Sequence, residues 1–242
     1  MVKHTQTILG PLWFVIQPVA LSIVLLLAVN KGAGVATEGV PPFLFNMCSL
    51  APWFYFSQTF HTVATTFMSN VGLFRKVYFP RLAVPVAVAL SNLVPLALQV
   101  IVFLFSMVAY RLAGYPVGTG WHLALLPVVF VQLVVFSLGM GLIAAALTAH
   151  YRDLAHALQY VVLLIMFGSL VFVPASSLPA DMRWITWMNP LAVIMESTRA
   201  AALGTAGIPA IQLAVSWAFT ALVAVVGVLV FDRATRTAID KS

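Results

Sequence analysis

The sequence predicts an all-α integral membrane protein with six transmembrane helices and a short interfacial or re-entrant helical segment before the last span. Of its 242 residues, 62% are hydrophobic and only 7% are charged, whereas ordinary soluble domains contain about 25% charged residues. The mean hydropathy is +1.06. The apolar residues form blocks of about 20, the length of helix that crosses a bilayer core. These blocks are too long for the strands of a membrane barrel and do not alternate, so we expect helices throughout.

The six expected spans follow one another with short connections, except for one. They cover residues 12–30, 42–69, 83–110, 122–149, 157–173 and 211–231. Residues 174–210, which separate the last two spans, contain too many large apolar side chains for a polar loop. Trp184, Trp187 and Leu191 are examples. We therefore expect this segment to form helices at or within the membrane surface.

Lys and Arg predict the orientation of the chain, because they accumulate in cytoplasmic loops. With the N-terminus inside, eight basic residues lie inside and four lie outside. The inner ones are Lys3, Arg75, Lys76, Arg81, Arg152, Arg233, Arg236 and Lys241, and the outer ones are Lys31, Arg111, Arg183 and Arg199. Both termini are thus predicted to be cytoplasmic. The net charge of +6 reflects these short loops and does not indicate nucleic-acid binding.

Several kinds of chemistry are excluded by the motifs that the sequence lacks. It has no P-loop, no His-Glu-x-x-His and no Gly-x-Ser-x-Gly, and its five histidines have no acidic neighbours at metal-ligand spacing. All six acidic residues lie outside the expected spans, although ion-coupled carriers usually keep a carboxylate there. We therefore expect a chain that is not an enzyme and binds no metal or cofactor. Active transport would draw its energy from another subunit.

The second span is predicted to have one polar and one aromatic side. At 100° per residue, Gln58, Thr62, Thr65 and Ser69 share one side with His61 at its edge, and Trp53, Phe56, Phe60 and Phe67 share the other. Phe54 and Tyr55 flank the polar side. The polar side either lines a pore for a polar cargo or forms hydrogen bonds between helices, each worth about 0.6 kcal/mol.

The fourth span carries small residues at every fourth position. They are Ser137, Gly141, Ala145 and Ala149, with Gly139 alongside, and this spacing lets two helix backbones approach closely. We expect a packing contact. Its partner is a helix either of the same chain or of a second copy.

The segment 70–81 has two interpretations. Val71, Phe74 and Tyr78 share a helical face, Arg75 and Lys76 point away from it, and Pro80 stops the helix. The segment either anchors the chain on the inner leaflet or presents a short helix to a soluble partner.

Two further charged groups lie near the expected membrane surfaces. Arg152 and Asp153 in the motif Tyr151-Arg152-Asp153 form at least a surface ion pair of near-zero energy. After Asn189-Pro190, Glu196 and Arg199 lie three residues apart on an expected helix. They pair either locally or across a closed gate.

Several motifs together resemble the polysaccharide-exporting ABC-2 permeases. These are the membrane subunits for O-antigen, capsular polysaccharide and teichoic acid export. The similar stretches are Gln6-Thr-Ile-Leu-Gly-Pro-Leu-Trp13 with Gln17-Pro18, Leu50-Ala-Pro-Trp-Phe-Tyr-Phe56, Leu73-Phe-Arg-Lys-Val-Tyr-Phe-Pro-Arg81, Tyr151-Arg-Asp153, and Asn189-Pro190 with Arg199. They keep the family's order over nearly the whole chain, and Lys-Val-Tyr-Phe-Pro-Arg is the most specific of them.

The resemblance implies a homodimer in the cytoplasmic (inner) membrane of a bacterium, with a separate ABC ATPase that binds ATP and Mg²⁺. It implies contacts with membrane lipid and a glycan or lipid-linked glycan cargo. The residues expected to couple to the ATPase are Phe74, Arg75, Lys76, Tyr78, Phe79, Pro80, Arg81, Tyr151, Arg152 and Asp153. The expected substrate path comprises Trp53, Phe54, Tyr55, Gln58, Thr62 and Thr65, with Trp13 as a further candidate. The segment 174–210 would form an outer gate with Asn189, Pro190, Glu196 and Arg199.

One departure from the family pattern concerns the start of the chain. Family members usually begin with an amphipathic helix, whereas only Met1-Val-Lys-His4 precedes the first motif here. We expect residues 1–242 to form a single ABC-2 transmembrane domain, with that helix absent through truncation or encoded upstream.

Three other functions compete with the export of a polysaccharide. An exporter of a drug, an antibiotic or a lipid would share the fold. An intramembrane enzyme would need acidic or nucleophilic groups within the spans, and no acidic residue or nucleophile motif is found there. A scaffold that transports nothing would leave the polar side of the second span without a role.

Overall fold

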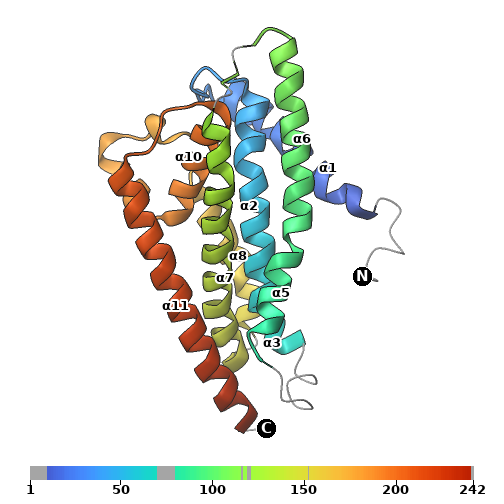
Figure 1. The fold of residues 1–242 in the computed structure, drawn as a ribbon, viewed down its shortest axis with the longest axis vertical. Helices are drawn as coiled ribbons and strands as arrows, with labels where there is room; N and C mark the ends of the chain where they lie inside the picture. The colour runs from blue at the N-terminus through green and yellow to red at the C-terminus, as the bar shows by residue number, and fades with distance from the viewer. Residues whose placement is uncertain (1–9, 70–79, 116, 119–120, 152, 241–242) are drawn as a thin grey trace.

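The computed structural model describes residues 10–69, 80–115, 117–118, 121–151 and 153–240. Within these ranges every regular element is a helix, which confirms the predicted fold class (Figure 1). The elements are η1 (Gly10–Leu12), α1 (Trp13–Leu25), η2 (Leu26–Gly32), α2 (Pro42–Ala64), α3 (Thr66–Ser69), α5 (Ala83–Ser91), α6 (Leu93–Leu112), η3 (Trp121–Leu125), α7 (Leu126–His150), α8 (Leu154–Gly168), η4 (Ala175–Ser177), η5 (Ala180–Met182), α9 (Ile185–Met188), α10 (Pro190–Leu203) and α11 (Ala210–Asp240).

Each of the six predicted spans contains a helix. Four helical stretches are long and apolar enough to cross a membrane alone: Trp13–Gly32, Ala83–Leu112, His122–Ala149 and Ala210–Thr235. The fifth span is shorter than predicted, because α8 ends at Gly168 after 15 residues, about 22 Å at 1.5 Å per residue. The second span, α2, contains 23 residues and carries more polar side chains than the others.

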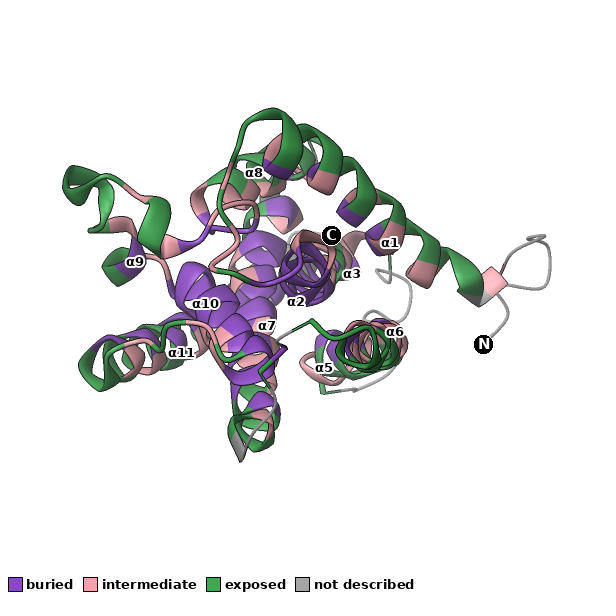
Figure 2. Ribbon diagram, turned by 90° about the horizontal axis from the view of Figure 1, so that it is seen from above, coloured by how far each residue is buried: buried purple, intermediate pink, exposed green. Residues whose placement is uncertain are grey.

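The centre of the bundle is formed by α2, α7 and α10. Seen from above, these helices are mostly buried, whereas α1, α6, α8 and α11 turn exposed faces outward (Figure 2). The exposed faces of α6 and α11 are apolar, as expected for contact with lipid: Phe105 is 76% exposed and Ile211 is 66% exposed. Because other helices cover α2, it needs fewer apolar residues than a helix that faces lipid.

Small residues bring α7 into backbone contact with α11 and into close contact with the side chain of Val63 on α2. A Cβ atom on Gly227 of α11 would lie 2.5 Å from the carbonyl oxygen of Gly139, and one on Gly141 would lie 2.7 Å from the Cβ of Val63 on α2. The hydroxyl of Thr148 also donates to the carbonyl oxygen of Ala64 at 2.6 Å. The small-residue contact predicted for the fourth span therefore joins helices of the same chain.

Two irregularities mark the helices nearest to α2. The stretch Leu26–Gly32 after α1 is a π-helix, a form that is rare and concentrated at functional sites. The third span is interrupted at Asn92, between α5 and α6. The Asn92 amide donates to the hydroxyls of Thr59 and Thr62 at 3.1 and 3.4 Å, so this break is hydrogen-bonded to α2.

Candidate transport path and outer helical segment

The polar side predicted for the second span is present on α2. Gln58, His61 and Ser69 are exposed, and Thr62 and Thr65 are partly buried. The Thr62 hydroxyl donates to the carbonyl oxygen of Gln58, and those of Thr65 and Ser69 donate to carbonyl oxygens one turn earlier, each at 3.0 Å. Because the helix uses these hydroxyl protons, this side offers the lone pairs of the hydroxyl oxygens together with the exposed amide of Gln58 and the imidazole of His61.

The opposite side of α2 forms the aromatic core. Phe56 packs between Phe60 and Phe136, with ring centroids 5.7 and 6.0 Å away. Trp53, predicted for the substrate path, is 4% exposed and packs on Phe56 at 5.6 Å. Within this single chain it is thus a core residue. The aromatic face belongs to the interior, as its helical spacing predicts.

A small cavity lies where α1, α2 and the α5–α6 break meet. Its volume is about 50 Å³, and it is lined by Phe14, Gln17, Phe54, Tyr55, Gln58, Asn92, Pro95, Leu96 and Gln99. Tyr55 is buried, and its hydroxyl donates to the carbonyl oxygen of Ala89 at 3.0 Å. Of the predicted path residues, Phe54, Tyr55 and Gln58 therefore share one site, whereas Trp13, 47% exposed on the first turn of α1, is not in the lining.

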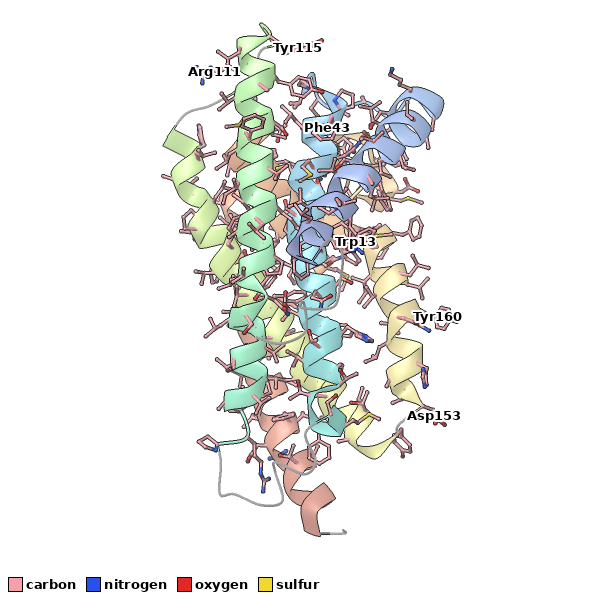
Figure 3. The ribbon with its side chains drawn as sticks, turned by 90° about the vertical axis from the view of Figure 1, so that its right-hand side faces the viewer. Trp13, Phe43, Arg111, Tyr115, Asp153 and Tyr160 are labelled. Atoms are coloured by element: carbon pink, nitrogen blue, oxygen red, sulfur yellow. The ribbon has the colours of Figure 1, made fainter. Side chains whose placement is uncertain are left out.

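The predicted coupling residues that the structure describes lie at one end of the bundle. Pro80, Tyr151 and Asp153 are exposed, and Figure 3 shows Asp153 at the end opposite to Tyr115. Arg81 donates from Nη1 to the hydroxyl of Thr235 on α11 at 3.2 Å. The other predicted residues, Phe74, Arg75, Lys76, Tyr78, Phe79 and Arg152, lie outside the described residues.

The long segment before the last span folds back into the bundle. Asn189 begins α10: its side-chain oxygen accepts from the backbone N–H of Leu191 at 3.0 Å, and its amide donates to the carbonyl oxygen of Gly168 at 2.9 Å. Pro190 then occupies the first turn of the helix, where its missing N–H has no cost. The helix ends at Gly204, whose φ is +69°. These signals place α10 beside the end of α8.

Glu196 and Arg199 form a buried ion pair inside this bundle. Nη2 of Arg199 donates to Oε1 of Glu196 at 2.5 Å, and Arg199 is 0% exposed. Of the two arrangements left open by the sequence, the local pair is the one observed. Glu196 lies outside the six predicted spans, yet α10 carries it into the protein interior.

Residues far away in the sequence complete the surroundings of Arg199. Nη1 donates to the hydroxyl of Ser49 at 2.8 Å and to the carbonyl oxygen of Leu170 at 2.9 Å. The guanidinium also lies 4.6 Å from the centroid of the Phe45 ring, within the range of a cation–π contact. Oε1 of Glu196 accepts a second hydrogen bond, from the backbone N–H of Ala175 at 2.6 Å. Through these hydrogen bonds, the Glu196–Arg199 pair connects α10 to α2 and to the turn after α8.

Sequence reasoning missed the buried polar residues near the start of α2. Ser49 receives the Arg199 hydrogen bond, and the Asn46 amide donates to the side-chain oxygen of Asn30 at 2.9 Å and to the carbonyl oxygen of Ser22 at 3.4 Å. The only local signal was the presence of Asn46 and Ser49 in an apolar span. Their partners follow from the tertiary packing and not from spacing along the chain.

These features define a multi-pass helical membrane protein with a buried helix, α10, before its last span and a polar side on its central helix. Residues 5–203 match the family model described as ABC-2 type transporter. The chain therefore belongs to the ABC-2 transporter family, whose members are membrane subunits of transporters.

Curated relatives match most of the chain. It is 28% identical over 201 residues to the O-antigen export system permease protein RfbA of Myxococcus xanthus. Two proteins of the same name from Klebsiella pneumoniae are 23% and 24% identical over 200 and 205 residues. Each match covers 82% of this chain and 74% of the relative.

Proposed function

We propose that this chain is the permease subunit of an ATP-driven exporter that moves a lipid-linked polysaccharide out across the cytoplasmic membrane. The observation that carries the proposal is its similarity, over 82% of its length, to three proteins named as O-antigen export permeases. The subunit works as a homodimer with both termini in the cytoplasm, in keeping with the excess of Lys and Arg in the inner segments.

The polar side of α2 supports a path for a hydrophilic cargo. Gln58 and His61 are exposed on a chain whose exterior is otherwise rich in apolar residues. Polar groups facing hydrocarbon are costly because no water is there to bond them. We infer that this side faces a water-containing path between two copies, where hydroxyl and amide groups meet the sugar hydroxyls.

Energy for export comes from a separate ATPase in this proposal, since the sequence holds no P-loop. That ATPase binds ATP and Mg²⁺ and contacts the end of the bundle that carries Pro80, Arg81, Tyr151 and Asp153. Conformational changes of the ATPase are transmitted to the membrane domain through residues 70–81. The Arg81–Thr235 hydrogen bond offers a direct route from that segment to α11.

The experiment combines co-purification with an export assay. The tagged chain is isolated from its native membrane in mild detergent, and associated proteins are identified by mass spectrometry. We expect a stoichiometric P-loop ATPase. Deletion of the gene for this chain should leave polysaccharide inside the cell, and re-expression of the chain should restore surface polysaccharide. Export of a drug, an antibiotic or a lipid with surface polysaccharide unchanged would reject the polysaccharide cargo and keep the family assignment.

A charge reversal tests the coupling segment. Arg75→Glu with Lys76→Glu should abolish export, while membrane insertion and ATP hydrolysis by the purified complex persist. The reason is that the conformational change of the ATPase is no longer transmitted to the permease. The matched control is Lys31→Glu with Arg111→Glu, which changes the same charge in the predicted outer loops and preserves the basic inner loops. Normal export by the Arg75 and Lys76 variant would exclude this coupling role.

A further inference from the structure

A second, larger cavity lies in a crevice between α7, α10 and α11. Its volume is about 270 Å³. Figure 1 shows α11 leaning away from α7 toward the predicted outer end, with α10 between them. Further in, α7 and α11 are joined, because the Gln132 amide donates to the hydroxyls of Ser216 and Thr220 at 2.7 and 3.2 Å. The lining residues Val129 and Leu213 lie one turn nearer to the outer end, so the crevice begins where the two helices separate.

The crevice opens on the lipid-facing surface of the bundle. Leu125 and Val128 in its lining are 42% and 53% exposed, and the neighbouring Ile211 on α11 is 66% exposed. Deeper in the crevice the lining is buried: Val129 and Ala201 are each 7% exposed. Because exposed apolar side chains surround its opening, the crevice is continuous with the surface that contacts lipid. Hydrocarbon is therefore what reaches it.

The wall of the crevice gives water few partners. Its polar side chains are His122, Ser197 and Thr205. His122 is exposed, at the outer edge, and the hydroxyl oxygen of Thr205 is buried, so a molecule in the crevice does not reach that oxygen. An enclosed water needs two to four polar partners, and of the side chains deeper in the crevice only Ser197 offers one. If the crevice were empty, its apolar wall would lose dispersion contacts.

We propose that one acyl chain of a bilayer phospholipid occupies this crevice as a bound component of the folded protein. The chain enters between α7 and α11, and its methylene groups contact Val129, Ala201 and Trp217. A methylene is about as large as a water molecule, so the volume holds roughly nine of them at about 30 Å³ each. The crevice thus takes part of one chain, while the other chain and the head group stay in the bilayer.

The contacts inside the crevice select a hydrocarbon chain and not a head group. Phospholipid chains are the hydrocarbon that surrounds α7 and α11 in a membrane. The site lies apart from the polar side of α2, so its occupancy does not depend on which cargo is exported.

The test is photolabelling of the full chain in lipid nanodiscs. The probe is a phosphatidylcholine with a diazirine in the middle of one acyl chain, and mass spectrometry locates the labelled residues. Chains in the surrounding bilayer label exposed residues such as Phe105 on α6, which is 76% exposed. A chain inside the crevice also reaches Ala201, which is buried. We expect labelling of residues 197–204 at least as strong as that around Phe105.

Variants that fill the crevice should exclude the chain. Ala200→Leu adds three carbon atoms at the lining of α10 and should reduce labelling of residues 197–204 at least fivefold, with the labelling around Phe105 unchanged. The matched control is Ala214→Leu, the same substitution at an exposed position of α11 outside the lining, and it should change neither. If Ala200→Leu fails to fold, Leu213→Trp fills the crevice from α11 and should give the same loss.

Two results would overturn the proposal at the level of the site. One is a parent chain in which residues 197–204 are not labelled, and the other is labelling that persists in both filled variants. A third result would reject the phospholipid as occupant: displacement of the probe by a polyprenyl phosphate at a concentration where unlabelled phosphatidylcholine does not displace it. The crevice would then hold the anchor of a lipid-linked cargo. Because the assay measures no export, its result is independent of the proposed function.

Discussion

The buried pair in α10 yields a prediction whose size follows from its contacts. Arg199→Met removes the hydrogen bonds from the guanidinium to Glu196, Ser49 and Leu170 and leaves the carboxylate of Glu196 buried without its counter-charge. Breaking such a pair from one side costs about 3–5 kcal/mol. We expect Arg199→Met to lower the free energy of unfolding by that amount.

A double variant separates charge from packing. When Glu196→Gln accompanies Arg199→Met, no unpaired charge is left, and the amide oxygen still accepts from the backbone N–H of Ala175. What remains is the loss of the hydrogen bonds from Arg199 to the neutral acceptors Ser49 and Leu170, about 1–2 kcal/mol. The double variant should therefore be more stable than Arg199→Met alone, by about 2 kcal/mol.

The assay is equilibrium unfolding in mixed micelles with rising dodecyl sulfate, followed by circular dichroism. Arg183→Met is the matched control: Arg183 is exposed, so this variant should stay within about 0.5 kcal/mol of the parent. A cost below about 1 kcal/mol for Arg199→Met would show that the guanidinium is not buried as described. A double variant no more stable than Arg199→Met would show that lost packing, and not the stranded charge, causes the effect.

Two further variants test the helix contacts and the polar side of α2. Gly227→Ala places a Cβ atom 2.5 Å from the carbonyl oxygen of Gly139, which should cost about 1–3 kcal/mol in the same assay. Gly168→Ala, where a Cβ meets nothing within 4 Å, should be neutral, and equal effects would argue against close contact of α7 and α11. Gln58→Cys, in a variant without the native cysteine, should react in intact membranes with a charged thiol reagent that does not enter hydrocarbon. Phe105→Cys should not react, although Phe105 is 76% exposed; labelling of both or of neither would contradict a water-containing path along α2.

Local periodicity predicts much of this fold and part of the site. The two sides of α2 follow from helical spacing alone, because a helix fixes which side chains share a face whatever lies around it. Gln58 and His61 are exposed and Phe56 and Phe60 are buried, as that spacing requires. Where a helix begins and ends is likewise local, which explains why each predicted span contains one.

The tertiary contacts of α10 could not be predicted from local periodicity. Glu196 and Arg199 make residues 190–203 more polar than a typical buried helix, so the sequence left open whether the segment lies at the membrane surface or re-enters the membrane. They are tolerated inside because Ser49 and Leu170 supply acceptors from 150 and 29 residues away. The partner of the small residues on α7 was equally hidden, since several apolar helices present suitable surfaces.

The close contacts of α7 also restrict how the membrane domain can move in the proposed export cycle. With Gly139 against Gly227 and Gly141 against the Val63 side chain, α7 has little room to shift toward either neighbour, so we expect α2, α7 and α11 to tilt together as one rigid unit. The length of α7, 25 residues, is about 38 Å at 1.5 Å per residue, and a tilt of about 5° displaces the far end by about 3 Å. We therefore expect a tilt of this size, started near His150, to shift the opposite end of α7 by about the length of a hydrogen bond.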